Sequence, residues 1–199
     1  MRIVAGRFRG RALTRVGKGD PANALRPTTD RVREALFNVL AGGRFGDPFD
    51  GPVLDLFAGT GALGLEALSR GAQRAVFVES GRKATGLLRK NIALLGVGDE
   101  TDTIPRDATR LPPNAGLPAT LVFLDPPYGK GLGARALQAA RAGGWIAPGA
   151  LIVWEEATAQ EAPGGFELLE TRPYGDTVVT LLEAGNPSVS RGTNDNGAL

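Results

Sequence analysis

The stretch VLDLFAGTGALGLEAL, residues 53–68, places an apolar run, a glycine-rich turn and a second apolar-periodic run in direct succession. Gly59, Gly61 and Gly64 have the spacing G-x-G-x-x-G between a predicted strand and a predicted helix. Glycine permits a tight turn and lets a ligand approach the backbone, and the first N–H groups of a helix have no intrahelical acceptor. The stretch therefore predicts a strand–turn–helix unit that binds a polar or charged group.

Strand and helix patterns alternate on both sides of this unit. Strands are predicted near 52–57, 75–79, 101–105, 120–124 and 150–155, and helices near 61–70, 82–96 and 132–143. Apolar strands that alternate with helices are typical of a parallel sheet covered on both faces. Two further strand-like runs, 166–172 and 177–183, have only RPYGD between them, which is too short for a crossover helix. We therefore expect an α/β, Rossmann-like sheet, mostly parallel, with an antiparallel hairpin at one edge.

The chain divides into three parts by pattern. Residues 1–45 are expected to form a basic extension: a hairpin over 1–15 with an arginine row, and then a helix within TTDRVREALFNVLAGG that ends at Gly42-Gly43. Thr28 or Thr29 can cap this helix. Residues 46–184 form the α/β domain, and the polar tail, 185–199, is expected to be disordered.

Charge and composition limit the chemistry. The net charge is +2, yet residues 1–33 hold nine Lys or Arg against two acids. Such a local excess suits phosphate contacts, although a solvated basic arm would look the same. The chain has no cysteine and no histidine, so thiol nucleophiles, disulfides and the commonest zinc ligands are excluded, and we expect no metal. No apolar run approaches the roughly 18 residues that span a bilayer, and the start is unlike a signal peptide, so we expect a cytoplasmic protein without membrane contact.

Acidic residues follow the predicted strands near the glycine turn. Glu79 ends the second strand, twenty residues after Gly59, where a carboxylate can accept hydrogen bonds from ribose hydroxyls. Asp55, within the first strand, could meet the cationic amino group of an amino-acid ligand, and Asp107, after the third strand, could bind an adenine amine. The pattern indicates an adenosine-bearing ligand, and a nicotinamide dinucleotide would use the same glycines and the same Glu79.

The sequence LVFLDPPYG, residues 121–129, follows the fourth strand at the same sheet edge. Two prolines make this corner stiff and leave its carbonyl oxygens without local donors. The Asp125 carboxylate and the Pro126 carbonyl can hold the hydrogens of a nucleobase amine, and Tyr128 can stack on the base. This pattern predicts methylation of an exocyclic amine that is unpaired or flipped out of its helix.

DPPY together with DLFAGTGALG and VFVES resembles the S-adenosylmethionine-dependent amino-methyltransferases. The opening MRIVAGRFRGRAL and the stretch LRPTTDRVREALFNVL make residues 1–183 similar to the RsmD family of 16S rRNA guanine-N2 methyltransferases. The resemblance implies a seven-stranded methyltransferase sheet, S-adenosylmethionine as cofactor and 16S rRNA as partner. We further expect a small-subunit particle as substrate and a monomeric enzyme.

The expected site residues fall into three groups. The cofactor group is Asp55, Phe57, Gly59, Thr60, Gly61, Glu79, Asp107 and Ala108. The group around the guanine is Asp125, Pro126, Pro127 and Tyr128. The group expected to contact RNA phosphates is Arg7, Arg9, Arg11, Arg26, Arg31 and Arg33.

Three alternatives stay open at this point. A DNA adenine-N6 or cytosine-N4 methyltransferase can also carry DPPY, but only about 50 residues precede the first predicted sheet strand, which leaves little room for a DNA-recognition region. A dinucleotide-dependent oxidoreductase would explain the glycines and Glu79 and leave DPPY without a role. A non-enzymatic RNA-binding protein would explain only the basic arm.

Overall fold

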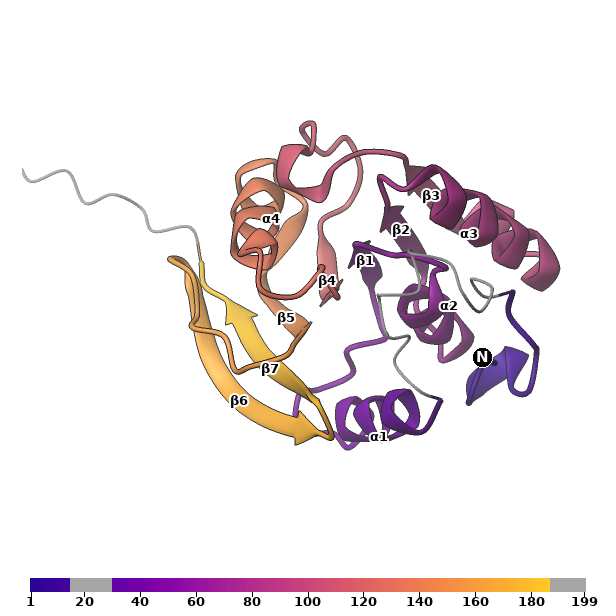
Figure 1. The fold of residues 1–199 in the computed structure, drawn as a ribbon, viewed down its shortest axis with the longest axis horizontal. Helices are drawn as coiled ribbons and strands as arrows, with labels where there is room; N and C mark the ends of the chain where they lie inside the picture. Colours follow the sequence, from indigo (N-terminus) through magenta and orange to yellow (C-terminus); the bar gives the residue numbers. More distant parts are fainter. Residues whose placement is uncertain (15–29, 187–199) are drawn as a thin grey trace, which may run out of the picture.

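The protein is built on one seven-stranded sheet, seen in the computed structural model, which describes residues 1–14 and 30–186 (Figure 1). The strands are β1 (Pro52–Leu56), β2 (Arg74–Val78), β3 (Thr101–Ile104), β4 (Ala119–Leu124), β5 (Ile146–Glu156), β6 (Phe166–Tyr174) and β7 (Thr177–Ala184). Their order is β3-β2-β1-β4-β5-β7-β6. Strands β1 to β5 are parallel, and β7 runs antiparallel to β5 and β6. The expected sheet and its edge hairpin are confirmed.

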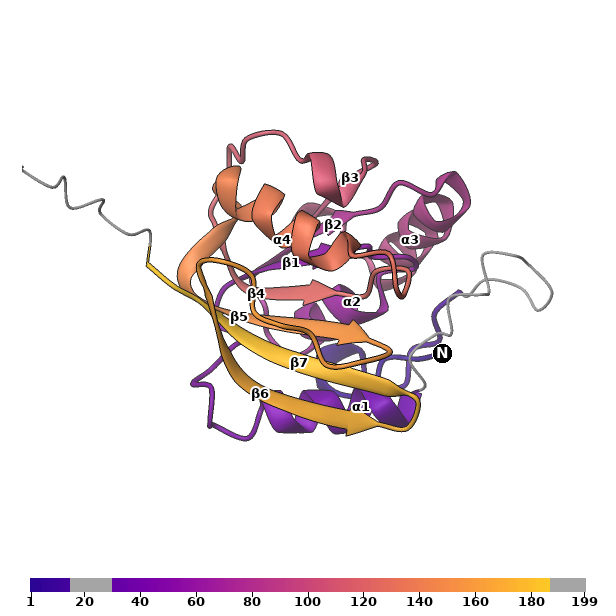
Figure 2. The ribbon, with the colours of Figure 1, turned by 60° about the vertical axis from the view of Figure 1, so that its left-hand side comes forward.

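Helices cover both faces of the sheet (Figure 2). They are α1 (Asp30–Leu40), α2 (Ala62–Ser69), α3 (Arg82–Leu95) and α4 (Leu132–Ala142), with the short 3-10 turns η1 (Gly6–Phe8), η3 (Gly98–Glu100) and η4 (Ala108–Arg110). Side chains alternate along each strand, so Val53 packs with α1, α2 and α3, whereas Leu54 and Leu56 pack with α4. In the described part of the chain no helix has the length and apolarity to cross a membrane.

Two predicted elements differ from the observed ones. Strand β5 begins at Ile146, four residues earlier than predicted, because Pro148 and Gly149 look like a chain break in the sequence and are nevertheless accommodated within the strand. The prediction of an N-terminal hairpin with two regular strands is wrong. A single antiparallel bridge joins Arg2 and Ala12, and the chain between them contains the 3-10 turn η1. Gly6 and Gly10 have φ of +77° and +83°, so the arginines between them do not form a strand row.

The N-terminal arm, residues 1–14, is fixed to the domain by polar contacts. The buried Glu66 carboxylate of α2 accepts the Val4 and Ala5 N–H groups at 2.7 and 3.0 Å. The Asn91 side chain of α3 bonds both the N–H and the carbonyl of Thr14, and it also donates to the Thr60 carbonyl in the glycine turn at 2.9 Å. Ile3 and Leu13 join the same core as α1 and α2. The arm is therefore part of one packed body with the sheet.

The topology places a switch point at the centre of the sheet, and we use the word crevice for the region outside the carboxyl ends of β1 and β4. After β1 the chain turns toward β2 and β3, and it later returns to β4 and β5 on the other side of β1. Open α/β sheets bind ligands at such a switch point, outside the carboxyl ends of the strands. The glycine turn follows β1 and the DPPY corner follows β4, so both lie at this position.

Candidate active site

The glycine turn has a backbone that other residues would resist. Gly59 and Gly61 have φ of +56° and +81°. A Cβ on Gly61 would lie 2.4 Å from Leu88 Cδ1, whereas a Cβ on Gly59 would have only the Phe57 oxygen, at 4.0 Å, nearby. Phe57 has φ of 62° and, among the described residues, is the single non-glycine in this region. The backbone at Gly59 is thus open to a ligand, while Gly61 is required for packing.

Glu79 holds the turn in place. Its Oε2 accepts the Gly59 N–H at 2.8 Å, and its Oε1 accepts the Gly81 N–H at 2.6 Å. Each carboxylate oxygen has a second lone pair, so the group can still accept two further hydrogen bonds. The half-buried carboxylate lies directly after β2, where the sequence pattern placed it. Its predicted role toward ribose hydroxyls stays a prediction.

Asp55 lies buried in β1 beneath the first turn of α2. Its Oδ2 accepts the Gly64 N–H at 2.9 Å, and a Cβ on Gly64 would approach the Phe77 ring to 2.4 Å. Burial raises the pKa of Asp55 to about 7; the Gly64 N–H acts in the opposite direction, and the Glu79 carboxylate raises it further. A cationic group bound nearby would therefore favour the ionised form of Asp55.

The raised pKa of Asp55 predicts a pH-dependent penalty on stability. The folded protein binds more protons than the unfolded chain between the ordinary pKa of 3.8 and about 7, so stability falls as pH rises through this window. Asp55→Asn removes the charge and keeps an oxygen for Gly64. We expect its thermal midpoint, relative to the wild type, to rise by several degrees between pH 4.5 and 7.5, at roughly 2–4 °C per kcal/mol, and to level off at higher pH, where Asp55 is ionised in both states. A difference that is constant with pH would contradict this assignment.

The DPPY corner follows β4 and is tied to β5 and β7. The Tyr128 hydroxyl lies 3.4 Å from Glu155 Oε1 and 3.2 Å from Thr177 Oγ1, whereas its side chain is 36% exposed. Burial raises the pKa of Tyr128 to about 12, which keeps the hydroxyl protonated. The Gly129 N–H donates to Glu156 Oε1 at 3.4 Å. The hydroxyl end of the ring is thus anchored while part of the ring stays accessible.

Asp125 completes an acidic cluster at the mouth of the crevice. Burial raises the pKa of Asp125 well above its ordinary range, and the carboxylates of Glu155, Asp55 and Glu156 raise it further, in that order. Asp55 pairs in register with Phe123, two residues before Asp125 on β4. Asp125 directly follows β4, so it lies at the carboxyl end of the strand that pairs with the strand of Asp55. The cluster strongly favours a positively charged ligand.

Asp107 and Ala108, two of the predicted cofactor residues, lie at the start of η4. Asp107 is exposed, and its Oδ1 accepts both the N–H and the hydroxyl of Thr109 at 2.8 Å, which caps η4 and lowers the pKa of Asp107. Ala108 is buried beside it. The described contacts of Asp107 are thus local to η4, and its predicted adenine contact stays a prediction.

The predicted RNA-contacting arginines differ in their exposure and in their ion pairs. The assignment of Arg33 is wrong: it is 1% exposed and pairs with Asp30 at 2.8 Å, because α1 packs it against Glu66 of α2. Arg7 is exposed but forms an ion pair with Glu100. Arg9, Arg11 and Arg31 are exposed, and Arg26 lies outside the described residues.

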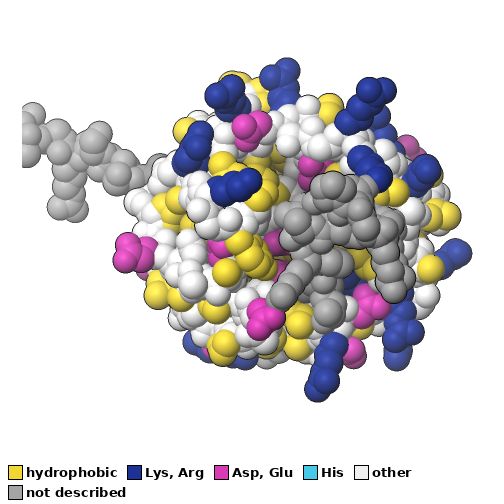
Figure 3. Space-filling model, in the orientation of Figure 1, with side chains coloured by type: hydrophobic (Ala, Val, Ile, Leu, Met, Phe, Trp, Pro, Cys, Tyr) yellow, Lys and Arg dark blue, Asp and Glu magenta, His cyan; other side chains and the backbone are white. Residues whose placement is uncertain are grey.

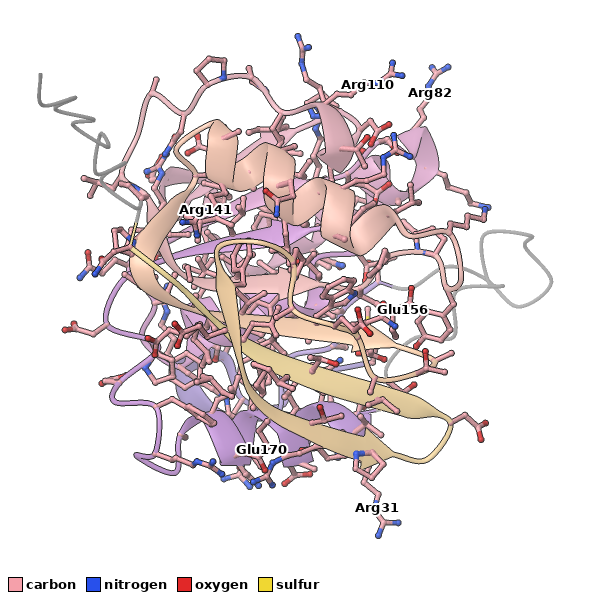
Figure 4. All side chains as sticks on the ribbon, turned by 90° about the vertical axis from the view of Figure 1, so that its left-hand side faces the viewer. Arg31, Arg82, Arg110, Arg141, Glu156 and Glu170 are labelled. Atoms are coloured by element: carbon pink, nitrogen blue, oxygen red, sulfur yellow. The ribbon has the colours of Figure 1, made fainter. Side chains whose placement is uncertain are left out.

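The sequence interpretation missed the buried pair Glu155 and Glu156 and the hydroxyl of Thr177. Both glutamates end β5, so they reach the same edge as Asp125 (Figure 4, where Glu156 is labelled). Two acids that directly follow an apolar run are a signal that could have been used, since the predicted strand near 150–155 ended on the first of them, Glu155. Thr177 gave no such signal, because only the β5–β7 pairing brings it to Tyr128.

Comparison with known proteins gives the following relatives. The family model described as Conserved hypothetical protein 95 matches residues 1–183. The Escherichia coli (strain K12) protein named Ribosomal RNA small subunit methyltransferase D is 40% identical over 188 residues, covering 92% of this chain and 89% of that protein. Its namesake from Haemophilus influenzae is 37% identical over 183 residues, covering 88% and 89%.

Solved structures of related sequence share the fold of this chain over most of its length. The structure of yhhF from Escherichia coli has a TM-score of 0.78 at 37% identity and covers 94% of this chain and 99% of that chain. A Haemophilus influenzae structure has a TM-score of 0.71 at 32% identity and covers 93% and 98%. Sheet, crevice and N-terminal arm therefore lie within the matched region.

Proposed function

The chain belongs to the family of ribosomal RNA small subunit methyltransferase D, and on that basis we propose that it transfers a methyl group from S-adenosylmethionine to the exocyclic N2 amine of a guanine in 16S rRNA. The observation that carries the proposal is the meeting of two features at one sheet edge: the glycine turn held by Glu79, and the DPPY corner with its acidic cluster. We also propose that the enzyme acts as a cytoplasmic monomer on a small-subunit particle.

The residues present fit S-adenosylmethionine, which carries a sulfonium and an ammonium group. Asp55 is buried and Asp125 is half-buried, and burial raises the pKa of both carboxyls. Repulsion from Glu79 raises the pKa of Asp55 further, and repulsion from Glu155, Asp55 and Glu156 raises that of Asp125 further. A cation relieves that repulsion, whereas the pyrophosphate of a dinucleotide would increase it. The electrostatics therefore favour the methyl donor over the nicotinamide cofactor of an oxidoreductase.

The chain's own residues would position the acceptor. When bound, the cofactor supplies an electrophilic methyl group. The lone pair of a guanine amine is conjugated into the ring, so the amine is a poor nucleophile until its hydrogens are held. The Asp125 carboxylate and the Pro126 carbonyl would accept those hydrogens, and the Tyr128 ring would stack on the base. Orienting two reactants in this way can contribute several kcal/mol, about 7–11 at best.

The test of this function is transfer of a labelled methyl group. Purified protein is incubated with labelled S-adenosylmethionine and either free 16S rRNA or small-subunit particles that lack the modification, and the RNA is digested to nucleosides. We expect N2-methylguanosine, with particles preferred over free rRNA. Label in N6-methyladenosine, or in DNA supplied in parallel, would show that the substrate is a different one. Absence of methyl transfer to any nucleic acid would contradict the proposal that the protein is a nucleic-acid methyltransferase.

The anchored tyrosine gives a graded prediction. Tyr128→Ala removes the stacking ring and is expected to lower kcat/KM by about 10–100-fold, as stacking contributes roughly 1–3 kcal/mol. Tyr128→Phe keeps the ring and loses the contacts to Glu155 and Thr177, so we expect a loss of about fivefold, near 1 kcal/mol. Thr177→Val should act in the same direction as Tyr128→Phe, and the two changes together should cost less than their sum. Full activity of Tyr128→Ala would remove the ring from its proposed role.

A further inference from the structure

A second basic surface lies at the sheet edge that carries the active site. We call it the carboxyl-edge rim and define it by five exposed side chains: Arg82, Arg106, Arg110, Lys130 and Arg135. Arg82 begins α3 after β2, and Arg106 and Arg110 follow β3. Lys130 follows the DPPY corner after β4, and Arg135 lies in the first turn of α4. The carboxyl ends of parallel strands meet at one edge, so all five lie around the crevice.

The figures agree with this placement. Figure 3 shows Lys and Arg side chains around much of the outline of the molecule, with Asp and Glu side chains among them. In Figure 4, Arg82 and Arg110 both project outward from the β2–β3 side of the molecule, far from Arg31 on α1. The acids that interact with Asp125 are buried, whereas the rim cations are exposed, a pattern that separates a cationic cofactor from a polyanionic partner.

Among the described residues, several arginines outside the rim form ion pairs with acids, whereas the rim cations form none. Arg7, Arg44 and Arg74 pair with Glu100, Glu170 and Asp102, respectively. Within residues 1–14 and 30–186, no rim residue forms an ion pair with an acid.

One acid, Asp107, lies near two of the rim cations. Arg110 and Arg135 both contribute to the lowered pKa of Asp107, so both lie near it, but the Asp107 carboxylate is directed to Thr109. The positive potential of the rim is therefore left available to a ligand from solution.

We propose that the carboxyl-edge rim binds the phosphate backbone of the RNA strand that flanks the target base. The inference rests on the proposed function, since it takes RNA as the substrate, and it extends the RNA footprint beyond the N-terminal arm. Within that arm, Arg7 is neutralised by Glu100, and in α1 Arg33 is buried, so the arm and helix offer fewer free cations than the sequence suggested. A strand held at the rim lies beside Tyr128, as placing an unpaired base against that ring requires. Such contacts orient the nucleic acid and do not read its sequence.

The test measures direct binding to unmethylated 16S rRNA as a function of KCl concentration. The variants are Arg82→Gln, Arg110→Gln and the double substitution. The matched control is Arg44→Gln, an exposed arginine beside Glu170 and away from the rim. Each lost phosphate contact should reduce the slope of log K against log salt by about 0.7–0.9, and we expect the double variant to bind rRNA roughly tenfold more weakly near 0.1 M salt. The affinity for S-adenosylmethionine, measured by calorimetry, should not change.

Three results would overturn the inference. One is an rRNA salt slope of the double variant equal to that of the wild type and of Arg44→Gln. Another is weaker binding of S-adenosylmethionine, which would assign the rim to the cofactor site. The third is weaker binding to small-subunit particles with unchanged binding to free rRNA, which would indicate a protein partner. The binding assay needs no turnover, so a protein that binds rRNA through the rim and methylates no guanine would refute the proposed function alone.

Discussion

Asp125→Ala is expected to lower kcat for guanine methylation by about 10²–10³-fold, the loss typical of removing one oriented polar group from a reacting centre. The methyl group of alanine cannot accept the hydrogens of the guanine amine, so its lone pair would stay conjugated into the ring. Binding of S-adenosylmethionine should be weakened but retained, because the Asp125 carboxyl is lost while Asp55, Glu79 and the glycine turn remain in place. The measurement is single-turnover methylation of small-subunit particles together with calorimetric binding of the cofactor.

Two further variants make this prediction specific. Asp125→Asn preserves the size of the side chain but replaces one acceptor oxygen by a donor, so we expect a loss close to that of alanine. Asp50→Asn, in the exposed loop before β1, is a surface control that should keep wild-type turnover. If Asp125→Ala turned over at the wild-type rate with cofactor and particle bound, Asp125 would have no part in holding the amine.

Glu66→Ala is expected to lower the thermal midpoint by on the order of 10 °C, because removing one partner of a buried ion pair costs about 3–5 kcal/mol. Glu66 is fully buried and holds Arg70 at 2.9 Å, with Arg33 at 3.9 Å and two backbone N–H groups of the arm. Without this carboxylate, Arg33 would keep Asp30 as its acidic partner, Arg70 would lose its carboxylate, and Val4 and Ala5 would lose their acceptor. The measurement is thermal unfolding followed by circular dichroism.

The arm gives this prediction a second readout. Proteolysis should cleave within residues 1–14 of Glu66→Ala much faster than in the wild type, since their backbone is held there by Glu66 and Asn91. Glu66→Gln keeps an oxygen for the backbone and should have an intermediate midpoint. Glu34→Ala, on the exposed side of α1, should unfold like the wild type. A midpoint of Glu66→Ala within a degree or two of the wild type would mean that the arm is held by its apolar contacts alone.

Local sequence was sufficient for the elements and for the centre of the site. The apolar runs and the glycine, proline and acidic residues at their ends are signals within a few positions, and they placed β1, the glycine turn, Glu79 and the DPPY corner. The predicted start of β5 was wrong because Pro148 and Gly149 are local signals for a chain break, whereas the tertiary structure keeps them within the strand. The prediction of an arginine row was wrong because Gly6 and Gly10 adopt positive φ values, which an alternating sequence pattern does not reveal.

The sequence by itself determined that this is an α/β sheet with a glycine-rich turn after one strand and the DPPY corner after another. It could do so because residue spacing along a strand or helix follows from backbone geometry. Tertiary structure alone decided which charges remain free. Arg33 forms ion pairs with Glu66 and Asp30, and Arg7 forms one with Glu100. In the same way, only the folded chain brings the Thr177 hydroxyl to Tyr128. Charge is a property of each residue, but whether it faces solvent, a ligand or an opposite charge depends on contacts between residues far apart in the chain.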